Sequence, residues 1–112
     1  MRPGKLTVLL RMLGRRKIAE GVLVEILSKP ECHLCEAAKE KLQRLQRKYG
    51  FQLLEINVAE SSALLAEFGT RIPLIRVNGA ITCKYTVDEI ALKQKFLRFA
   101  AARKSRLETF KK

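Results

Sequence analysis

The chain has 112 residues, of which 47% are hydrophobic, so its length and composition allow one domain with a substantial core. No apolar run approaches the ~18 residues that a membrane-spanning helix needs, and three cysteines are too few for a secreted disulfide framework. We therefore expect a soluble protein of a reducing compartment, where a close cysteine pair indicates redox or metal chemistry.

The net charge of +12 is concentrated at the two ends of the chain. Residues 1–20 hold six Lys or Arg against one Glu, residues 93–112 hold eight against one, and residues 21–92 hold nine of each sign. Basic ends of this kind can bind nucleic acid or an anionic membrane, or can remain solvated. No aromatic residues alternate with these charges to stack on bases, so we expect no specific nucleic-acid partner.

The charge distribution also suggests the domain boundaries. We expect a basic extension over residues 1–20, a domain over 21–102 and a basic tail over 103–112. The extension is rich in Leu and nearly free of acidic residues, which leaves a mitochondrial presequence and a matrix location as the alternative. Because the extension lacks Ser and Gly14 weakens an amphipathic helix, we favour the cytoplasm.

The first elements of the domain follow Gly21. The run 22–27 is mostly apolar and rich in β-branched residues, which indicates a buried strand. Gly50 occupies the position of a helix C-terminal glycine, and residues 51–58 alternate as a second strand. The helix between them is predicted from apolar residues that recur at spacings of three and four, namely Leu34, Ala38, Leu42, Leu45 and Tyr49.

The second half of the domain predicts one more helix and a hairpin. A short helix is expected over 60–68 and a strand over 74–77, and Asn78-Gly79 is a two-residue hairpin signal that leads into a strand over 80–84. With the last helix, the order β-α-β-α-β-β-α predicts an α/β fold. We expect a mixed four-stranded sheet with helices on both faces, its first two strands parallel and its last two antiparallel.

The last helix has its own start signal. Thr86 and Glu89 have the spacing of a capping box, in which Thr86 caps and Glu89 reaches back. The apolar contacts expected from this helix are Ile90, Leu92, Phe96, Leu97 and Phe99.

Cys32 and Cys35 carry the clearest chemical signal. They lie three residues apart at the start of the first predicted helix, a spacing that brings both sulfurs to one side within bridging reach. The helix N-terminus favours a thiolate, as do Lys29 and a charged His33, whereas Glu31 acts against it. We therefore expect an exchanging dithiol with Cys32 exposed and Cys35 in the first turn.

Other interpretations of the pair remain open, among them that both cysteines are inert or merely structural. It could form half of a zinc site with His33 and Cys83, although zinc takes four ligands and the chain has no second Cys-x-x-Cys or His pair. The chain could also be a non-enzymatic binding module that uses the same pair. Cys83 has no motif around it and is expected to be a small buried hydrophobe, with a third redox thiol as the alternative.

Three motifs together resemble the glutaredoxin-like branch of the thioredoxin superfamily, especially its small members with a Cys-His-Leu-Cys centre. They are residues 28–35, residues 70–73 and Asn78-Gly79, and the resemblance covers about residues 22–99. It implies a thioredoxin-like fold and a cis bond before Pro73, with Ile72 offering backbone hydrogen bonds to a bound thiol substrate. It also implies that Cys32 attacks and Cys35 resolves.

The residues and the resemblance together give the expected partners and substrate-binding residues. The expected substrate is a disulfide-containing protein or a glutathione adduct, and the candidate electron donor is glutathione. We expect a monomer with no tightly bound cofactor and no metal. The expected substrate-binding residues are Lys29, His33, Ile72, Pro73 and Asp88. Residues 82–88 lack the Gly-Gly pair of typical glutaredoxins, and Asp88 or the N–H groups of that helix start are the candidates to meet an anionic glutathione.

Overall fold

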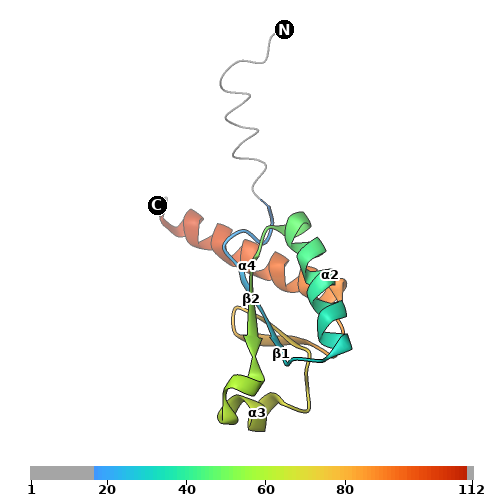
Figure 1. Ribbon diagram of the computed structural model, residues 1–112. Coiled ribbons are helices and arrows are strands. Elements are labelled where there is room, and N and C mark those ends of the chain that lie inside the picture. Colours follow the sequence, from blue (N-terminus) through green and yellow to red (C-terminus); the bar gives the residue numbers. More distant parts are fainter. Residues whose placement is uncertain (1–16, 111–112) are drawn as a thin grey trace.

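The computed structural model describes residues 17–110, and it describes the side chains of residues 17–104. Its elements are β1 (Leu23–Ser28), α2 (His33–Tyr49), β2 (Gln52–Asn57), the 3-10 turn η1 (Val58–Glu60), α3 (Ser62–Phe68), β3 (Leu74–Val77), β4 (Ala80–Lys84) and α4 (Glu89–Phe110) (Figure 1). This order confirms the predicted β-α-β-α-β-β-α arrangement. The interpretations of residues 1–16 and 111–112, including the presequence, fall outside the described residues.

The sheet has four strands in the order β2-β1-β3-β4. β1 and β2 are parallel, with Leu23 opposite Gln52, while β3 is antiparallel to both β1 and β4. The pairing of β3 with β4 shifts register between Ile75 and Arg76. The mixed sheet expected from the sequence is thereby confirmed. Among residues 17–110, no helix has the length and apolar character needed to cross a membrane.

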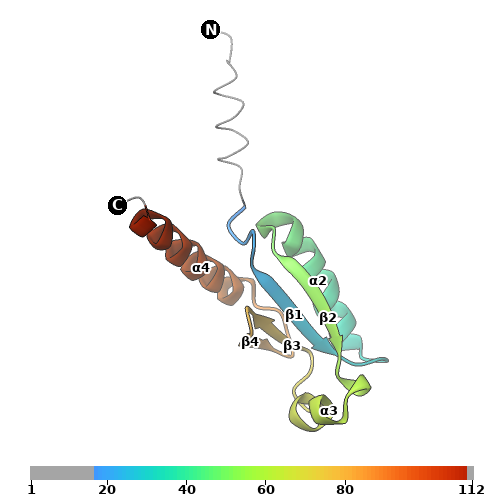
Figure 2. The same ribbon diagram turned by 90° about the vertical axis from the view of Figure 1, so that its left-hand side faces the viewer.

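The two faces of the sheet carry separate cores because consecutive strand residues point to opposite sides. Ile26 lies in the larger core, which is formed with buried side chains of α2 and α4. Leu27 lies in the smaller core, which includes Phe68 of α3. In Figure 2, α2 lies along the strands and α3 lies beyond the ends of β1 and β2. Helices therefore contribute buried side chains to the cores on both faces, as predicted.

The predicted apolar face of α2 is confirmed along most of the helix. Four of the five predicted positions are buried, namely Ala38, Leu42, Leu45 and Tyr49. Gly50 ends the helix in the left-handed region at φ 83°, and its N–H donates to the carbonyl of Gln46 at 2.8 Å. The prediction is wrong for Leu34, which is 56% exposed, because Cys35 takes the buried position in the first turn.

Packing begins before Gly21. Ala19 is fully buried in the larger core, and its N–H donates to the carbonyl of Tyr49 at 2.8 Å. Lys17 Nζ donates to the carbonyl of Arg47 at 2.5 Å. Residues 17–20, which the sequence analysis placed in the basic extension, therefore contact the end of α2.

The start of α4 corrects the predicted capping box. The helix begins at Glu89, and the Oδ1 of Asp88 accepts from the N–H groups of Ile90 and Ala91 at 3.0 and 3.2 Å. Asp88 is therefore the residue that caps the helix, not Thr86. Glu89 does not play the reciprocal role, because its carboxylate accepts from side chains of α2 instead.

The contacts of α4 correct a second prediction. Leu92 and Phe96 are fully buried, but Ile90 and Leu97 are 72% and 48% exposed. Residues seven apart share a helix stripe, so Ile90 and Leu97 lie together on a face turned away from the Leu92 stripe. Phe99 is partly buried and packs against the larger core, as expected.

Candidate functional site

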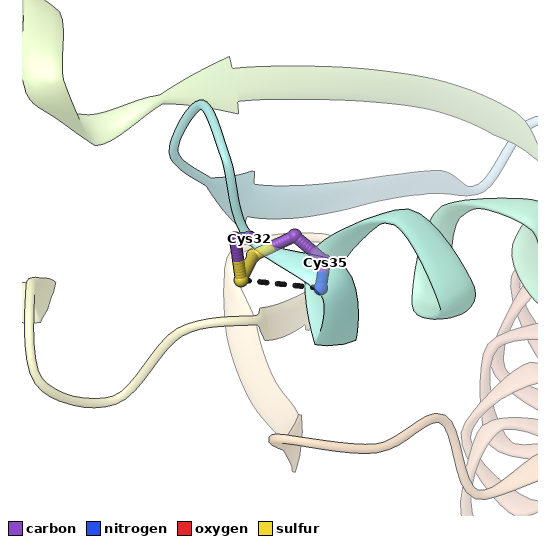
Figure 3. Close-up of a disulfide and its surroundings, with 2 residues drawn as sticks. All are labelled: Cys32 and Cys35. Atoms are coloured by element: carbon purple, nitrogen blue, oxygen red, sulfur yellow. Dashed lines mark hydrogen bonds between the residues drawn. A yellow bond between two sulfur atoms is a disulfide. The ribbon is translucent and has the colours of Figure 1, made fainter.

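Cys32 and Cys35 form a disulfide at the N-terminus of α2, with their Cα atoms 5.2 Å apart. Cys32 is the N-cap residue in an extended conformation, and its Sγ accepts a hydrogen bond of 3.2 Å from the N–H of Cys35 (Figure 3). Cys35 is 2% exposed, whereas Cys32 is only partly buried. The more accessible sulfur is therefore held at the end of the helix where backbone N–H groups and the helix dipole favour negative charge.

The disulfide borders the smaller core. Cys35 belongs to that core and Cys32 packs against it, together with Ile72, which is 9% exposed. The peptide bond between Ile72 and Pro73 is cis, and the side chain of Pro73 is fully buried. Of the predicted site residues, Ile72 is thus brought to the same cluster as both cysteines.

Lys29 and His33 flank Cys32 in the chain, and both are exposed. Lys29 lies in the loop after β1, and His33 is the first residue of α2. Glu31 of the same loop adopts a left-handed conformation with φ 58°. The residues next to Cys32 in the chain therefore carry exposed charged and polar side chains.

Asp88 and Cys83 belong to a different part of the molecule. Asp88 caps α4, so two N–H groups of that helix start already have an acceptor. Cys83 is buried in the larger core, and its Sγ lies 3.8 Å from the carbonyl of Asp88. Burial raises the pKa of the Cys83 thiol.

The zinc interpretation needs a third donor near the cysteine pair. Residues 17–110 contain no group of three or more His, Cys, Asp or Glu side chains able to hold a metal ion. Cys83 lies in the larger core, while Cys35 lies in the smaller core on the other face of the sheet. His33 is exposed. The four candidate ligands therefore do not form one site.

A small groove along the first turns of α2 was not predicted. It has a volume of about 150 Å³ and lies between the start of α2 and the segment that joins β4 to α4. Its lining includes Leu34, Lys41, Tyr85 and Val87. Tyr85 has no readable role in the sequence, because only the fold brings the β4–α4 segment beside α2.

The comparison with protein families agrees with this architecture. Residues 23–97 match the family model described as Glutaredoxin-like domain (DUF836). The chain belongs to this glutaredoxin-like family. Uncharacterized proteins of Mycobacterium bovis and Mycobacterium tuberculosis are each 33% identical over 75 residues, covering 62% of this chain and 77% of theirs.

Solved structures share the fold of this chain. Protein Ne2328 from Nitrosomonas europaea is 25% identical, with a TM-score of 0.61 over 66% of this chain and 89% of that one. A mutant thioredoxin from Halobacterium salinarum is 21% identical, with a TM-score of 0.53 over 72% of this chain and 76% of its own. The thioredoxin-like fold and the glutaredoxin-like family predicted from the sequence are thus both confirmed.

Proposed function

We propose that this glutaredoxin-like protein is a thiol-disulfide oxidoreductase in which Cys32 is the nucleophile and Cys35 the resolving thiol. The observation that carries the proposal is the unequal placement of two bridged sulfurs at one helix start. Cys32 caps α2 and is partly exposed, whereas Cys35 is 2% exposed in the first turn. An incoming disulfide therefore meets Cys32 first.

The exchange proceeds in two balanced steps. The Cys32 thiolate attacks one sulfur of the substrate disulfide, forms a mixed disulfide with it and expels the other sulfur as a thiolate, which takes a proton from solvent. Cys35 then loses its proton and attacks the Sγ of Cys32. The Cys32–Cys35 bond forms, the second substrate sulfur leaves, and two electrons have passed from the protein to the substrate.

The surroundings of the cysteines suit this sequence of steps. The N–H of Cys35 already donates to the Sγ of Cys32, and the same donor would stabilise a Cys32 thiolate in the reduced protein. Ile72 lies against the pair and is the candidate to offer backbone hydrogen bonds to the substrate. The candidate reductant is glutathione, two molecules of which would return the protein to the dithiol and leave as glutathione disulfide.

Trapping the mixed disulfide tests the proposal. The reduced Cys35→Ser protein, also carrying Cys83→Ser, is mixed with a peptide mixed disulfide and analysed by intact mass and peptide mapping. We expect a stable adduct on Cys32, because the resolving thiol is missing. The matched control carries Cys32→Ser and Cys83→Ser, and we expect it to form an adduct much more slowly. If this control formed an adduct on Cys35 as fast as the first variant does on Cys32, the assigned roles would be reversed.

A further inference from the structure

Helix α4 presents large aliphatic side chains to solvent. Its inner stripe, formed by Leu92, Phe96 and Phe99, packs in or against the larger core. Ile90 and Leu97 lie seven residues apart and share a stripe on the other side, where they are 72% and 48% exposed. The helix therefore has a second apolar stripe that the domain leaves largely uncovered.

Basic side chains flank this exposed stripe on both sides. At about 100° per residue, Lys93 and Lys104 lie on one side of the stripe and Arg98 lies on the other. All three are exposed, and none of them forms an ion pair within residues 17–104. These three basic residues, together with Ile90 and Leu97, are called the outer face of α4 below.

A groove joins the outer face of α4 to the edge strand β4. It has a volume of about 190 Å³. Its lining comes from both elements and consists of Ile81, Thr82, Ala91, Gln94, Lys95 and Arg98. Because Ile81 is 44% exposed, aliphatic surface continues from the helix onto the strand. Lys95 and Arg98 give the same groove two cations.

The surroundings of the outer face are strongly positive. Residues 80–104 contain six Lys or Arg and two acids, Asp88 and Glu89. Both acids are already bonded, because Asp88 caps α4 and the Glu89 carboxylate accepts from two side chains of α2. The charge of this surface therefore complements an anionic partner.

The exposed aliphatic stripe favours a membrane over a nucleic acid as that partner. Nucleic acids are bound by cations along the backbone and by aromatic rings that stack on bases, and neither contact uses exposed aliphatic side chains. Helices that lie on membranes combine the two features of α4. Their aliphatic side chains enter the boundary between headgroups and acyl chains, while Lys and Arg meet anionic headgroups.

We infer that the outer face of α4 binds the surface of a membrane that contains anionic phospholipids. Ile90 and Leu97 enter the boundary between headgroups and acyl chains, and the basic side chains beside them meet lipid phosphates. Removal of the two aliphatic side chains from water and neutralisation of the cations both favour the bound state.

This mode of docking leaves the disulfide accessible. In Figure 2, α4 lies on the β4 side of the molecule, whereas the loop that joins β1 to α2 and carries Cys32 lies on the opposite side. A protein held to a membrane through α4 therefore still exposes Cys32 to solvent. The inference thus does not depend on the proposed exchange.

Vesicle flotation of the full chain tests the inference. Binding to vesicles of phosphatidylcholine alone is compared at low ionic strength with binding to vesicles that also contain phosphatidylserine. We expect at least about tenfold tighter binding to the vesicles with phosphatidylserine. Because residues 1–16 also contain five Lys or Arg and no acid, variants are needed to assign the binding to α4.

A pair of charge variants tests the cations of the outer face. Arg98→Glu and Arg44→Glu change the net charge equally, and Arg44 is an exposed residue of α2. We expect Arg98→Glu to weaken binding about thirtyfold, because one cation is lost and one anion is gained at the membrane surface. Arg44→Glu should weaken it less than about threefold, because that charge lies away from the headgroups.

A second pair tests the aliphatic stripe. Leu97→Gln and Leu54→Gln replace side chains that are both 48% exposed, the first on α4 and the second on β2. Leu97→Gln should weaken binding about fivefold, because less apolar area leaves water. Leu54→Gln should leave it unchanged.

Three results would overturn the inference. The first is failure of the full chain to bind vesicles with phosphatidylserine at low ionic strength. The second is an equal loss within either pair of variants, because the binding would then lie outside the outer face of α4. The third is tighter binding to a DNA duplex that Arg98→Glu weakens and Leu97→Gln does not, which would assign the surface to nucleic acid. Disulfide exchange should be normal in Leu97→Gln, so these results leave the proposed function intact.

Discussion

The N–H of Cys35 donates to the Sγ of Cys32, so the residue that caps α2 is also the residue proposed to attack the substrate. In the reduced protein we expect iodoacetamide to label Cys32 roughly tenfold faster than Cys83. Cys32 is partly exposed at the positive end of a helix, whereas Cys83 is 6% exposed and its burial raises its pKa. Timed alkylation and mass mapping give the order, and equal labelling rates would contradict it.

The cap of α4 gives a second prediction. Asp88→Ala should lower the free energy of unfolding by about 1 kcal/mol, because two N–H groups lose their acceptor. Thr86→Ala should change it by less than ~0.5 kcal/mol. Urea unfolding of both variants measures the difference. A larger decrease in the free energy of unfolding for Thr86→Ala than for Asp88→Ala would contradict Asp88 as the cap and support the capping box expected from the sequence.

Tyr49 and Glu89 join α2 to α4 in a pH-dependent way. The Tyr49 hydroxyl donates to the Glu89 carboxylate at 2.7 Å, and hydrogen bonds from Lys48 and Tyr49 lower the pKa of Glu89. Stability from these bonds is present above the unfolded pKa of a glutamate, ~4.3, and is lost as the pH falls through the lowered folded value.

The corresponding variant is Tyr49→Phe, which keeps the ring contact with Phe96. It should lower the free energy of unfolding by about 1 kcal/mol at pH 7, and the loss should shrink in acid as Glu89 becomes protonated. Tyr85→Phe is the control, because Tyr85 is exposed and the hydrogen bond of its hydroxyl is longer. Urea unfolding at several pH values measures both, and a loss independent of pH would contradict the assigned partner.

The amino-terminal boundary of the packed domain gives a fourth prediction. A chain that starts at Gly21 should have a free energy of unfolding about 2 kcal/mol lower than one that starts at Lys17. The shorter chain lacks the buried methyl of Ala19 and the hydrogen bond from the N–H of Ala19 to the carbonyl of Tyr49. Thermal unfolding of the two truncated chains compares them directly. Equal stability would show that residues 17–20 do not support the core.

The sequence was sufficient for the fold because the elements rest on local signals. The apolar period of α2, the glycine at Gly50 and the Asn78-Gly79 turn each specify structure over a few residues. These signals, combined in chain order, already imply a parallel first pair of strands and an antiparallel last pair. The observed sheet follows that order.

The errors arose where two residues compete for one role. Thr86 and Asp88 both have a side chain that can cap a helix, and the choice depends on Glu89, which the fold directs to Lys48 and Tyr49. At the start of α2, periodicity alone could not tell that Cys35 rather than Leu34 would be buried. Only tertiary contacts decide such cases.

In the candidate site, too, local signals could be predicted from the sequence and tertiary contacts could not. Cys32 and Cys35 were visible because their spacing at a helix start has a direct chemical meaning. The groove was not, because its walls come from residues far apart in the sequence, such as Leu34 and Tyr85. A tyrosine between a strand and a helix cap carries no pattern that would indicate such a wall.

The stoichiometry of a single turnover tests the proposed exchange at Cys32 and Cys35. Reduced full-length protein is mixed with one equivalent of a peptide mixed disulfide, quenched with acid and analysed by mass spectrometry for the state of all three cysteines. We predict that both substrate sulfurs are released as thiols, that Cys32 and Cys35 become bridged, and that Cys83 remains free. An unreacted substrate, or a bridge that involves Cys83, would contradict it.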